Sequence, residues 1–580
     1  MAKYTNEKNI LTLIALLKQH GIKNIIASPG TTNISFVASV QSDPYFNVIS
    51  CVDERSAAYM ACGIASETLE PVVLTCTGAT ASRNYVPGLT EAYYRKLPVI
   101  AVTATQHLGR VGQNMPQVLD RSSQFADLVK KSIQLYQVHT EEDAWACNLA
   151  INDVLLESVR DGGGPVHINM ITTYSNDFSN SKLPIERKID RVTYSDELPA
   201  IKDTEVAVYI GNHKKMSSEL TGEIQRFCEK FNGVVLCDHT SNYHGKYSVL
   251  PNLITSQPDA DRYKNIKFLI DLGEVSGMYA GLNPARVWRV SEDGNVVDTF
   301  KKLTCVFEMD ELGFFKNYNS IREECLKMDY FESWKAKREQ LEAKIEESKI
   351  PFSNPWIARQ VSPNIKDGDK VHLAILNTLR SWNLCEVNAM ADFYSNTGGF
   401  GIDGIMSTAL GDSLVTDSNV YCFIGDLAFF YDLNSIGNKN LGKNLRILLI
   451  NNGCGTEFHN FNHRAVAVSA NNNLSPEYFA ADGHYGNKSK DLVKHYAEDL
   501  GFEYLSASNK KEFMKKMGIF VSGQSEKPIL FEVFTDEKDE SDALKMLYSL
   551  ENSAKANMKN MAKKVLGERG KATIKKILGK

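Results

Sequence analysis

A strand–helix–strand segment in the C-terminal third constrains this 580-residue chain more than any other stretch. An apolar run from Val420 to Ile424 ends at Gly425-Asp426-Leu427, and a second apolar run from Leu445 to Ile450 ends at Asn451-Asn452. The residues between the runs are helical in character, so the two strands are expected to be parallel neighbours. Asp426 and Asn452 then lie side by side at the carboxyl edge of the sheet, where ligands bind in open α/β folds.

The side chains at this edge favour a hard divalent cation. A carboxylate from Asp426, an amide oxygen from Asn452 and a nearby backbone carbonyl are oxygen ligands, which suit Mg²⁺ that also binds a diphosphate. Each residue alone has an ordinary interpretation, Asp426 as a helix N-cap and Asn452 as a turn residue. The pair at this spacing makes metal binding the stronger hypothesis.

The chain repeats this alternation of strands and helices in three consecutive regions. Further expected strands are Asn24–Ser28, Val72–Cys76, Val99–Thr103, Val206–Ile210, Gly233–Cys237, Phe268–Leu272 and Ile529–Val533. Strands that alternate with helices form parallel sheets covered on both faces. We therefore predict an α/β fold with three doubly wound parallel-sheet domains, residues 1–187, 188–350 and 351–550. The highly charged stretch Lys335–Lys349 is expected to be a solvated helix that leads into the third domain.

Residues 551–580 differ from the rest of the chain in charge. They contain nine Lys or Arg and two Glu, with Ala554, Met558, Met561 and Val565 at helical spacing. A basic amphipathic tail of this kind can contact an acidic partner or an anionic membrane surface. A solvated terminal helix docked on its own protein is the alternative, and the more ordinary, interpretation.

The composition excludes several classes of protein. The net charge is −5, which predicts no general affinity for nucleic acid. No apolar run approaches about 20 residues, and the polar N-terminus lacks the apolar core of a signal peptide. The 11 cysteines include no C-x-x-C pair, and most lie in apolar runs where buried thiols are expected. A reduced, cytoplasmic setting fits this pattern.

Several motifs, in order along the chain, carry a family resemblance. They are Ser28-Pro29-Gly30, Asp53-Glu54-Arg55-Ser56-Ala57-Ala58, residues 75–100, Gly401–Ala409 and the segment Gly425–Asn452. Together they resemble the thiamine-diphosphate-dependent decarboxylases and synthases, and among these the menaquinone-pathway 2-succinyl-5-enolpyruvyl-6-hydroxy-3-cyclohexene-1-carboxylate synthases. The resemblance implies that the three domains are the pyrimidine, central and diphosphate domains of that group.

The resemblance also implies a thiamine diphosphate cofactor held with Mg²⁺. In the family a glutamate bonds the pyrimidine ring of the cofactor, and Glu54 matches it; a helix-start glutamate that favours the helix dipole is the alternative. The implied metal ligands are Asp426, Asn452 and the backbone carbonyl of Cys454. Ile402 matches the apolar residue that wedges between the two cofactor rings, with a core isoleucine as the alternative. Further implied cofactor contacts lie at Pro29, Gly30, Gly425, Leu427 and Gly455.

The substrate side departs from the family pattern. The menaquinone-pathway synthases bind two polyanionic substrates through arginines, which pair with carboxylates in a bidentate manner. At four matching positions this chain has Thr32, Gln106, Phe393 and Thr397. Loss of one buried charge-assisted contact costs about 2–5 kcal/mol. Four such losses predict substrates other than isochorismate and 2-oxoglutarate.

The remaining side chains of the predicted pocket are mostly neutral hydrogen-bonding groups that suit a less charged, polyhydroxylated acceptor. They are Thr31, Thr32, Asn33, Gln106, His107, Gln113, Asn114 and Gln117. His107 is a candidate general acid or base, with a surface or capping histidine as the alternative. Glu457 is a candidate proton donor, with an ordinary helix-start glutamate as the alternative. The candidates for binding a substrate carboxylate are Arg83, Arg95 and Arg110.

The predicted activity is decarboxylation of a 2-oxo acid and transfer of the acyl carbanion to an acceptor, with the cofactor as electron sink. Three alternatives stay open: a simple decarboxylase that releases an aldehyde, a menaquinone-type 2-oxoglutarate-dependent synthase, and a silent binding subunit of the same fold. Family enzymes bind the cofactor between two subunits, so a homodimer or homotetramer is expected.

Overall fold

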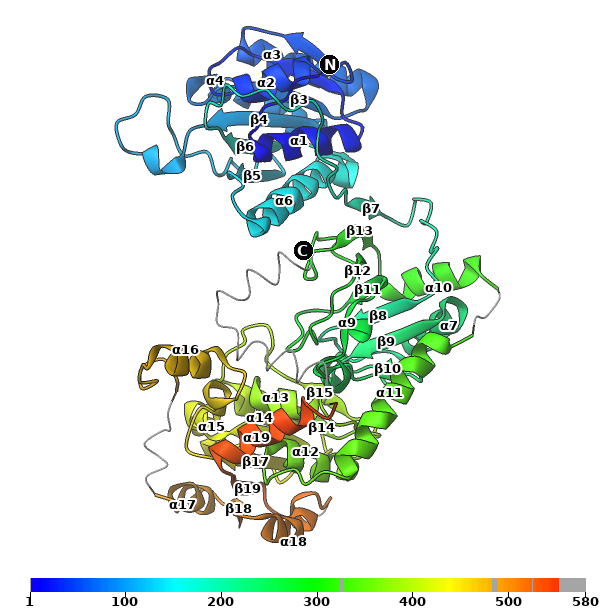
Figure 1. The fold of residues 1–580 in the computed structure, drawn as a ribbon, viewed down its shortest axis with the longest axis vertical. Helices are drawn as coiled ribbons and strands as arrows, with labels where there is room; N and C mark the ends of the chain where they lie inside the picture. The colour runs from blue at the N-terminus through cyan, green and yellow to red at the C-terminus, as the bar shows by residue number, and fades with distance from the viewer. Residues whose placement is uncertain (1, 324–326, 482–488, 524, 552–580) are drawn as a thin grey trace, which may run out of the picture. The chain divides into compact units, whose positions relative to one another are not determined.

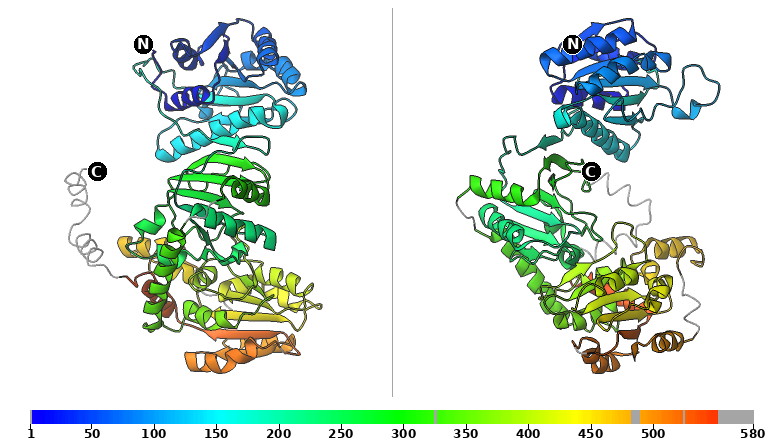
Figure 2. Two further views of the ribbon diagram at one scale, coloured as in Figure 1. Left: turned by 90° about the vertical axis from the view of Figure 1, so that its right-hand side faces the viewer. Right: turned by 180° about the vertical axis from the view of Figure 1, so that it is seen from behind.

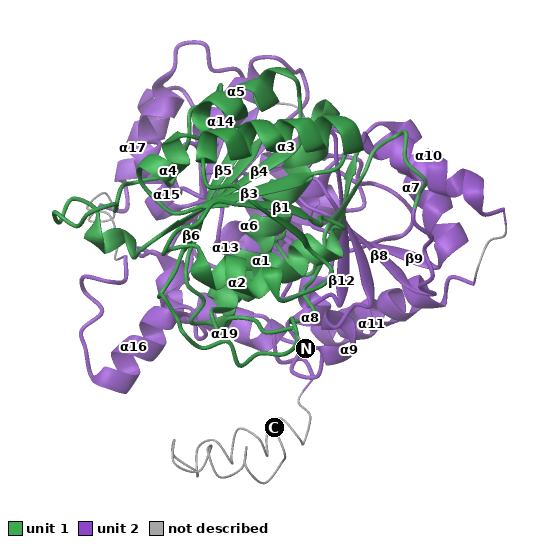
Figure 3. Cartoon of the chain, turned by 90° about the horizontal axis from the view of Figure 1, so that it is seen from above, with its two compact units in different colours: residues 1–198, 293–308 green, residues 199–292, 309–580 purple. Residues whose placement is uncertain are grey.

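The computed structural model describes residues 2–323, 327–481, 489–523 and 525–551 (Figure 1). The chain forms two compact units, residues 1–198 with 293–308 and residues 199–292 with 309–580 (Figure 3). The predicted domain boundaries at residues 187 and 350 stay predictions. The predicted basic tail lies outside the described residues except for Glu551.

The first unit is built on a six-stranded parallel sheet with the order β2-β1-β3-β4-β6-β5. Its strands are β1 (Asn24–Ala27), β2 (Asn47–Ser50), β3 (Val72–Cys76), β4 (Val99–Thr105), β5 (Lys131–Leu135) and β6 (Val166–Ile171). Its main helices are α1 (Lys8–Gln19), α2 (Ile34–Gln41), α3 (Glu54–Thr68), α4 (Thr80–Arg83), α5 (Val86–Tyr94) and α6 (Glu141–Val159). Helices α1, α2 and α6 pack on one face and α3 and α5 on the other. Because both faces are covered, β3 and β4 are buried along their whole length.

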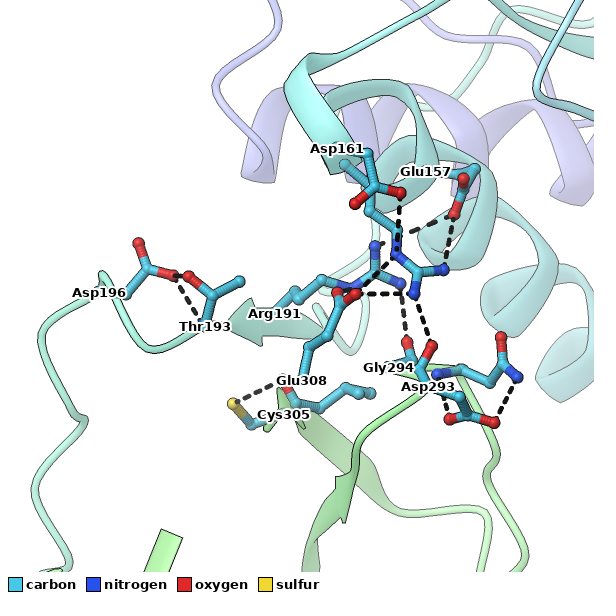
Figure 4. Close-up of polar contacts among 12 residues, drawn as sticks. Glu157, Asp161, Arg191, Thr193, Asp196, Asp293, Gly294, Cys305 and Glu308 are labelled. Atoms are coloured by element: carbon cyan, nitrogen blue, oxygen red, sulfur yellow. Dashed lines mark hydrogen bonds and ion pairs between the residues drawn. The ribbon is translucent and has the colours of Figure 1, made fainter. Parts of the chain in front are cut away.

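A short strand pair joins this unit from distant parts of the chain. Strand β7 (Asp190–Val192) pairs in parallel with β13 (Leu303–Glu308). Arg160, at the end of α6, donates from Nη2 to Glu308 Oε1 at 2.7 Å. Arg191 Nε lies 3.4 Å from Glu308 Oε2 (Figure 4). These largely buried ion pairs tie residues 293–308 to the first unit, an association that the sequence did not predict.

The second unit contains the five strands of the central region and a separate six-stranded sheet (Figure 1 and Figure 2). The central strands follow the order β10-β9-β8-β11-β12: β8 (Val206–Ile210), β9 (Gly233–Cys237), β10 (Ser248–Val249), β11 (Phe268–Leu272) and β12 (Arg286–Ser291). Their helices are α7 (Ser218–Phe231), α8 (Asn252–Thr255), α9 (Asp261–Lys264), α10 (Glu311–Ile321) and α11 (Asp329–Glu346). Helix α11 corrects a prediction: it starts before Lys335 and buries Phe331, Trp334 and Leu341, so it is packed along one side rather than solvated.

The other sheet of this unit contains the strand–helix–strand segment from Val420 to Asn452, for which a ligand site is predicted. Its order is β15-β14-β16-β17-β19-β18, all parallel. The strands are β14 (Lys370–Leu373), β15 (Asp392–Tyr394), β16 (Val420–Gly425), β17 (Leu445–Asn451), β18 (Glu503–Ala507) and β19 (Ile529–Phe534). The helices are α12 (Asn354–Val361), α13 (Asn377–Trp382), α14 (Ile405–Ser413), α15 (Asp426–Tyr431), α16 (Arg464–Asn472), α17 (Leu492–Asp499), α18 (Lys510–Phe520) and α19 (Glu537–Leu547). The predicted α/β class with three parallel sheets is confirmed.

Two further sequence expectations can be compared with the described residues. All ten described cysteines are free thiols, and every one except Cys51 is buried, as predicted. Among the described helices, none has the length and apolar character needed to cross a bilayer.

Helix α19 is anchored through a buried carboxyl group. Glu540 is 1% exposed, and its two oxygens each accept from Asn354 N at 3.0 Å. Thr535 Oγ1 also donates to Glu540 Oε1 at 2.8 Å. Burial nevertheless dominates and raises the pKa of Glu540 from its usual 4.5 to about 7. This carboxyl group therefore binds a proton more tightly in the folded than in the unfolded chain.

Glu540 is predicted to make folding stability fall with rising pH. Between about pH 4.5 and pH 7 the unfolded chain has lost this proton while the folded chain still holds it. The contribution of Glu540 to the free energy of unfolding is therefore fully present below pH 4.5 and lost by pH 7. Glu540→Gln should raise the thermal unfolding midpoint at pH 8 relative to wild type and leave it nearly unchanged at pH 5. Glu526→Gln, at an exposed glutamate of the same unit, is the matched control. An equal effect of Glu540→Gln at both pH values would contradict the prediction.

Candidate active site

The Asp426 carboxylate stands where a buried strand turns into a helix. Strand β16 ends at Gly425, and Asp426 is the first residue of α15, so the N-cap position belongs to Gly425 and not to Asp426. Asp426 is 3% exposed. Its Oδ1 accepts from Leu427 N and its Oδ2 from Gly453 N, both at 2.7 Å. Two backbone amides therefore fix the orientation of this carboxylate.

The loop after β17 completes the oxygen-rich edge. Gly425 lies opposite Ile450 in the parallel register, so the two strands end at the same level. Asn452 donates from Nδ2 to Thr456 Oγ1 at 2.6 Å, and its Oδ1 accepts from Cys454 N at 3.4 Å. Since Gly453 also bonds Asp426, the predicted meeting of the two strand ends is confirmed.

The neighbouring backbone is close-packed on one side and open on the other. A Cβ at Gly455 would lie 2.9 Å from Ala481, so only glycine fits there without movement, whereas a Cβ at Gly425 would meet nothing within 4 Å. Leu427 is half-buried beside Gly455. Ile402 is also half-buried and packs against the core of this sheet. The space at Gly425 lies beside oxygen atoms that backbone amides hold in place, and it leaves room for a bound group.

Glu457 is engaged by an arginine that the sequence did not identify. Arg380, in α13, donates from Nη1 to Glu457 Oε2 at 2.6 Å and from Nη2 to Oε1 at 2.8 Å. Both side chains are about four-fifths buried. This bidentate pair fixes the Glu457 carboxylate, and a role for Glu457 as proton donor would require the pair to separate.

Glu54 occupies the start of a helix in the first unit without serving as its cap. Asp53 is the N-cap of α3 and accepts from Arg55 N at 3.0 Å. Glu54 is half-buried, and its Oε2 accepts from Asn84 Nδ2 at 3.3 Å. The capping requirement of α3 is thus met by Asp53, which leaves the Glu54 carboxylate available for another role.

The carboxyl ends of β1, β3 and β4 form a compact polar edge in the same unit. A Cβ at Gly30 would lie 2.4 Å from Thr77 Cβ, which explains the glycine after Pro29. Thr32 is buried, shares a 2.7 Å hydrogen bond with Thr77 and donates to Ala104 O at 3.1 Å. Asn33 is buried and donates to Ser28 O at 3.0 Å. Thr32 and Asn33 therefore hold the edge together, whereas Thr31 is exposed.

The predicted pocket residues on the loop after β4 are mostly at the surface. His107 is exposed and accepts from Gly109 N at 3.1 Å as the cap of a short 3₁₀ turn, which favours the capping interpretation. Gln106 is half-buried and bonds Arg110. Gln113 and Gln117 are exposed.

Phe393 and Thr397, two of the predicted substrate positions, lie inside the second unit. Phe393 is 2% exposed and stacks on His239 with ring centroids 4.6 Å apart. Thr397 is buried and accepts from Asn212 Nδ2 at 3.0 Å. Phe393 therefore serves packing, and Thr397 serves a hydrogen bond within the unit. Phe393 also lines a cavity of about 270 Å³ with Asp238 and His239, which the sequence did not predict.

Arg121 is a buried cation of the first unit that sequence analysis missed. It is 5% exposed, one of its Nη atoms donates to Ala79 O, and its Nε has no hydrogen-bond partner among the described residues. Burial lowers the pKa of the Arg121 guanidinium, and the ionisable groups that influence this pKa are Cys76 and Arg83 rather than a carboxylate. A buried guanidinium of this kind favours an anionic partner. No periodic pattern marks a single arginine in a loop, so the sequence carried no signal for it.

Comparison with known proteins agrees with this arrangement. Residues 11–144 match a family model described as thiamine pyrophosphate enzyme, N-terminal TPP binding domain. The chain is 30% identical over 570 residues to a 2-succinyl-5-enolpyruvyl-6-hydroxy-3-cyclohexene-1-carboxylate synthase of Bacteroides thetaiotaomicron, an alignment that covers 94% of this chain and 99% of the relative. It is 30% identical to the synthase of Phocaeicola vulgatus, and 27% identical to that of Flavobacterium johnsoniae, each over at least 93% of this chain and 98% of the relative.

Proposed function

The chain belongs to the thiamine-diphosphate-dependent family of these synthases, and from that premise we propose that it decarboxylates a 2-oxo acid and transfers the acyl fragment to an acceptor. The observation that carries this proposal is the contact between Asp426 and the loop of Asn452, with open space at Gly425. A second candidate is the reaction for which the relatives are named. A simple decarboxylase and a silent binding subunit are further alternatives.

The donor set at the strand ends fits Mg²⁺ and a diphosphate. Asp426 would supply a carboxylate oxygen, Asn452 an amide oxygen and Cys454 its backbone carbonyl, which are the hard ligands that Mg²⁺ prefers. The start of α15 adds a positive helix end that favours phosphate. When bound, thiamine diphosphate supplies the carbon nucleophile and the electron sink. Gly425, Leu427 and Gly455 would border it.

The residues of the first unit are proposed to bind the pyrimidine end of a cofactor that family enzymes hold between two subunits. Glu54 is proposed to accept a hydrogen bond from the cofactor's pyrimidine ring, because Asp53 and not Glu54 caps helix α3. Pro29 and Gly30 are proposed as backbone contacts. Ile402, from the second unit, is proposed to support the bent cofactor through its half-buried side chain.

A homodimer, or a tetramer built from two of them, is part of this proposal. Large apolar side chains remain exposed on and before α3 and on α5 in the first unit, namely Val52, Tyr59, Met60 and Tyr94. Exposed apolar groups of this size favour burial against another protein surface. A second copy of the chain is the partner expected from the family.

Substrate recognition is proposed to differ from that of the relatives. Thr32, Gln106, Phe393 and Thr397 are neutral, and the first, third and fourth are already used within the fold. Arg121 is proposed as the group that binds the carboxylate of the oxo acid, because it is buried with no carboxylate of its own among the described residues nearby. One arginine suits a monocarboxylic oxo acid better than a dicarboxylic one.

The first prediction tests the activity itself. Wild-type protein supplied with thiamine diphosphate and Mg²⁺ should release CO₂ from pyruvate or another small oxo acid, but not from 2-oxoglutarate.

Glu54→Gln should bind the cofactor and lose roughly 10²–10⁴-fold in turnover, as expected for loss of acid–base assistance. Glu67→Gln, an exposed glutamate of the same helix, is the control. Preference for 2-oxoglutarate would favour the second candidate, and wild-type turnover in Glu54→Gln would remove the role of Glu54.

A second prediction concerns the metal ligands. Asp426→Ala should abolish Mg²⁺-dependent retention of thiamine diphosphate, measured by isothermal titration with and without Mg²⁺. Asp417→Ala, at an exposed aspartate before β16, should behave as wild type. Unchanged cofactor affinity in Asp426→Ala would refute the metal assignment.

A third prediction concerns Arg121. Arg121→Gln should raise the KM for the preferred oxo acid by roughly 10–100-fold, the loss expected for one charge-assisted contact. Cofactor affinity should stay unchanged. Arg121→Lys, which keeps the positive charge, should raise the KM for the oxo acid less than Arg121→Gln does. Arg262→Gln, at an exposed arginine of the second unit, is the control. A lowered unfolding midpoint with an unchanged KM would show that Arg121 only supports the Ala79 loop.

A further inference from the structure

Three side chains of different chemistry converge beside the loop that follows Asn452. Cys454 lies on that loop, His459 ends the 3₁₀ turn η6 (Thr456–His459), and Glu537 is the first residue of α19. The Cys454 Sγ, one ring nitrogen of His459 and one carboxylate oxygen of Glu537 all lie within 4.8 Å of one another. His459 Nδ1 and Glu537 Oε1 are 3.0 Å apart.

The elements that carry these groups are held in place by other contacts. Phe461 N donates to Ser541 Oγ at 2.8 Å, which fastens the loop to α19. Gly455 N donates to Ala481 O at 2.9 Å. Asp536 caps the first turn of α19 by accepting from Lys538 N at 2.9 Å. The cluster is therefore positioned by its scaffold, as a preorganised site requires.

We propose that Cys454, His459 and Glu537 bind a thiophilic divalent cation of the zinc class. Thiolate, imidazole and carboxylate together suit Zn²⁺, with bonds of about 2.0–2.3 Å in a tetrahedral arrangement. Two ligands of one such ion lie roughly 3–4 Å apart, so the observed cluster needs only small side-chain shifts to close on it. Three protein ligands leave the fourth position for water.

The three side chains differ in solvent exposure, and this difference gives the ion a route of entry. Cys454 is buried at 7% exposure, the His459 side chain is 17% exposed and the Glu537 side chain is 50% exposed. A cation can therefore meet Glu537 first and the sulfur last. Mg²⁺ does not compete well here, since it prefers oxygen ligands and is reluctant to lose its water.

The site would share a residue with the proposed Mg²⁺ ligands, a consequence that rests on the proposed function. Cys454 Sγ lies 3.6 Å from Asn452 Oδ1, and the Cys454 carbonyl is a proposed Mg²⁺ ligand. A cation on the sulfur would therefore influence the turn that presents both oxygens. The binding of the zinc-class ion itself is independent of the activity and can be measured without a substrate.

The test uses the full-length, tag-free chain, freed of metal with a chelator and kept in excess Mg²⁺ during titration with Co²⁺. Wild type should bind one Co²⁺ per chain, show a thiolate-to-cobalt charge-transfer band in the near ultraviolet, and lose that band when Zn²⁺ is added. Cys454→Ser should abolish the band. His459→Ala and Glu537→Gln should each weaken Co²⁺ binding by at least about tenfold, the loss of one ligand.

Cys51→Ser, at a half-buried thiol of the first unit, is the matched control and should keep the wild-type band. Absence of the band in wild type would overturn the proposal, whatever the variants do. Retention of the band in Cys454→Ser would overturn it as well and would identify another thiol as the ligand. Under either result the His459–Glu537 contact would be an ordinary ion pair. Failure of the proposed function would leave the cobalt spectrum unchanged, so the two proposals fail separately.

Discussion

The parallel pairing of β16 with β17 is the constraint on which the candidate site depends. With Gly425 opposite Ile450, both strands end at the same level, and Gly453 can donate to the Asp426 carboxylate. A slip of one residue would turn every side chain of β17 to the opposite face of the sheet. Since helices cover both faces of this sheet, the slip would disturb two apolar layers at once. The packing of the core therefore fixes the position of the site's oxygen atoms.

The features that could be predicted from the sequence are those with a local signal. Strands buried on both faces appear as continuous apolar runs, so β3, β8 and β11 were predicted with the bounds that the structure has. The meeting of Asp426 with the Asn452 loop follows from the same pattern. Residues 293–308 could not be placed, because the contact of Arg160 with Glu308 joins positions 148 apart and leaves no periodic trace.

The candidate site was less predictable than the fold, since a residue type does not reveal its partner. Glu457 stands in a suggestive motif, yet Arg380, 77 positions away, holds both of its oxygens. Phe393 and Thr397, both predicted as substrate positions, make a stacking contact and a hydrogen bond within the second unit. Arg121 is in an unremarkable loop, and only its burial without a nearby described carboxylate sets it apart.

The loop after Asn452 presents two ligand chemistries through one residue. The Cys454 carbonyl and the Asn452 amide offer hard oxygen, whereas the Cys454 thiol and His459 offer sulfur and nitrogen. Such sets sort cations by class, so Mg²⁺ and a zinc-class ion need not compete for one position. The carbonyl and the thiol of Cys454 belong to one residue, so a shift of its backbone moves both. If both proposed sites are filled, each cation must alter the other's affinity by the same factor, because coupling between binding sites is reciprocal.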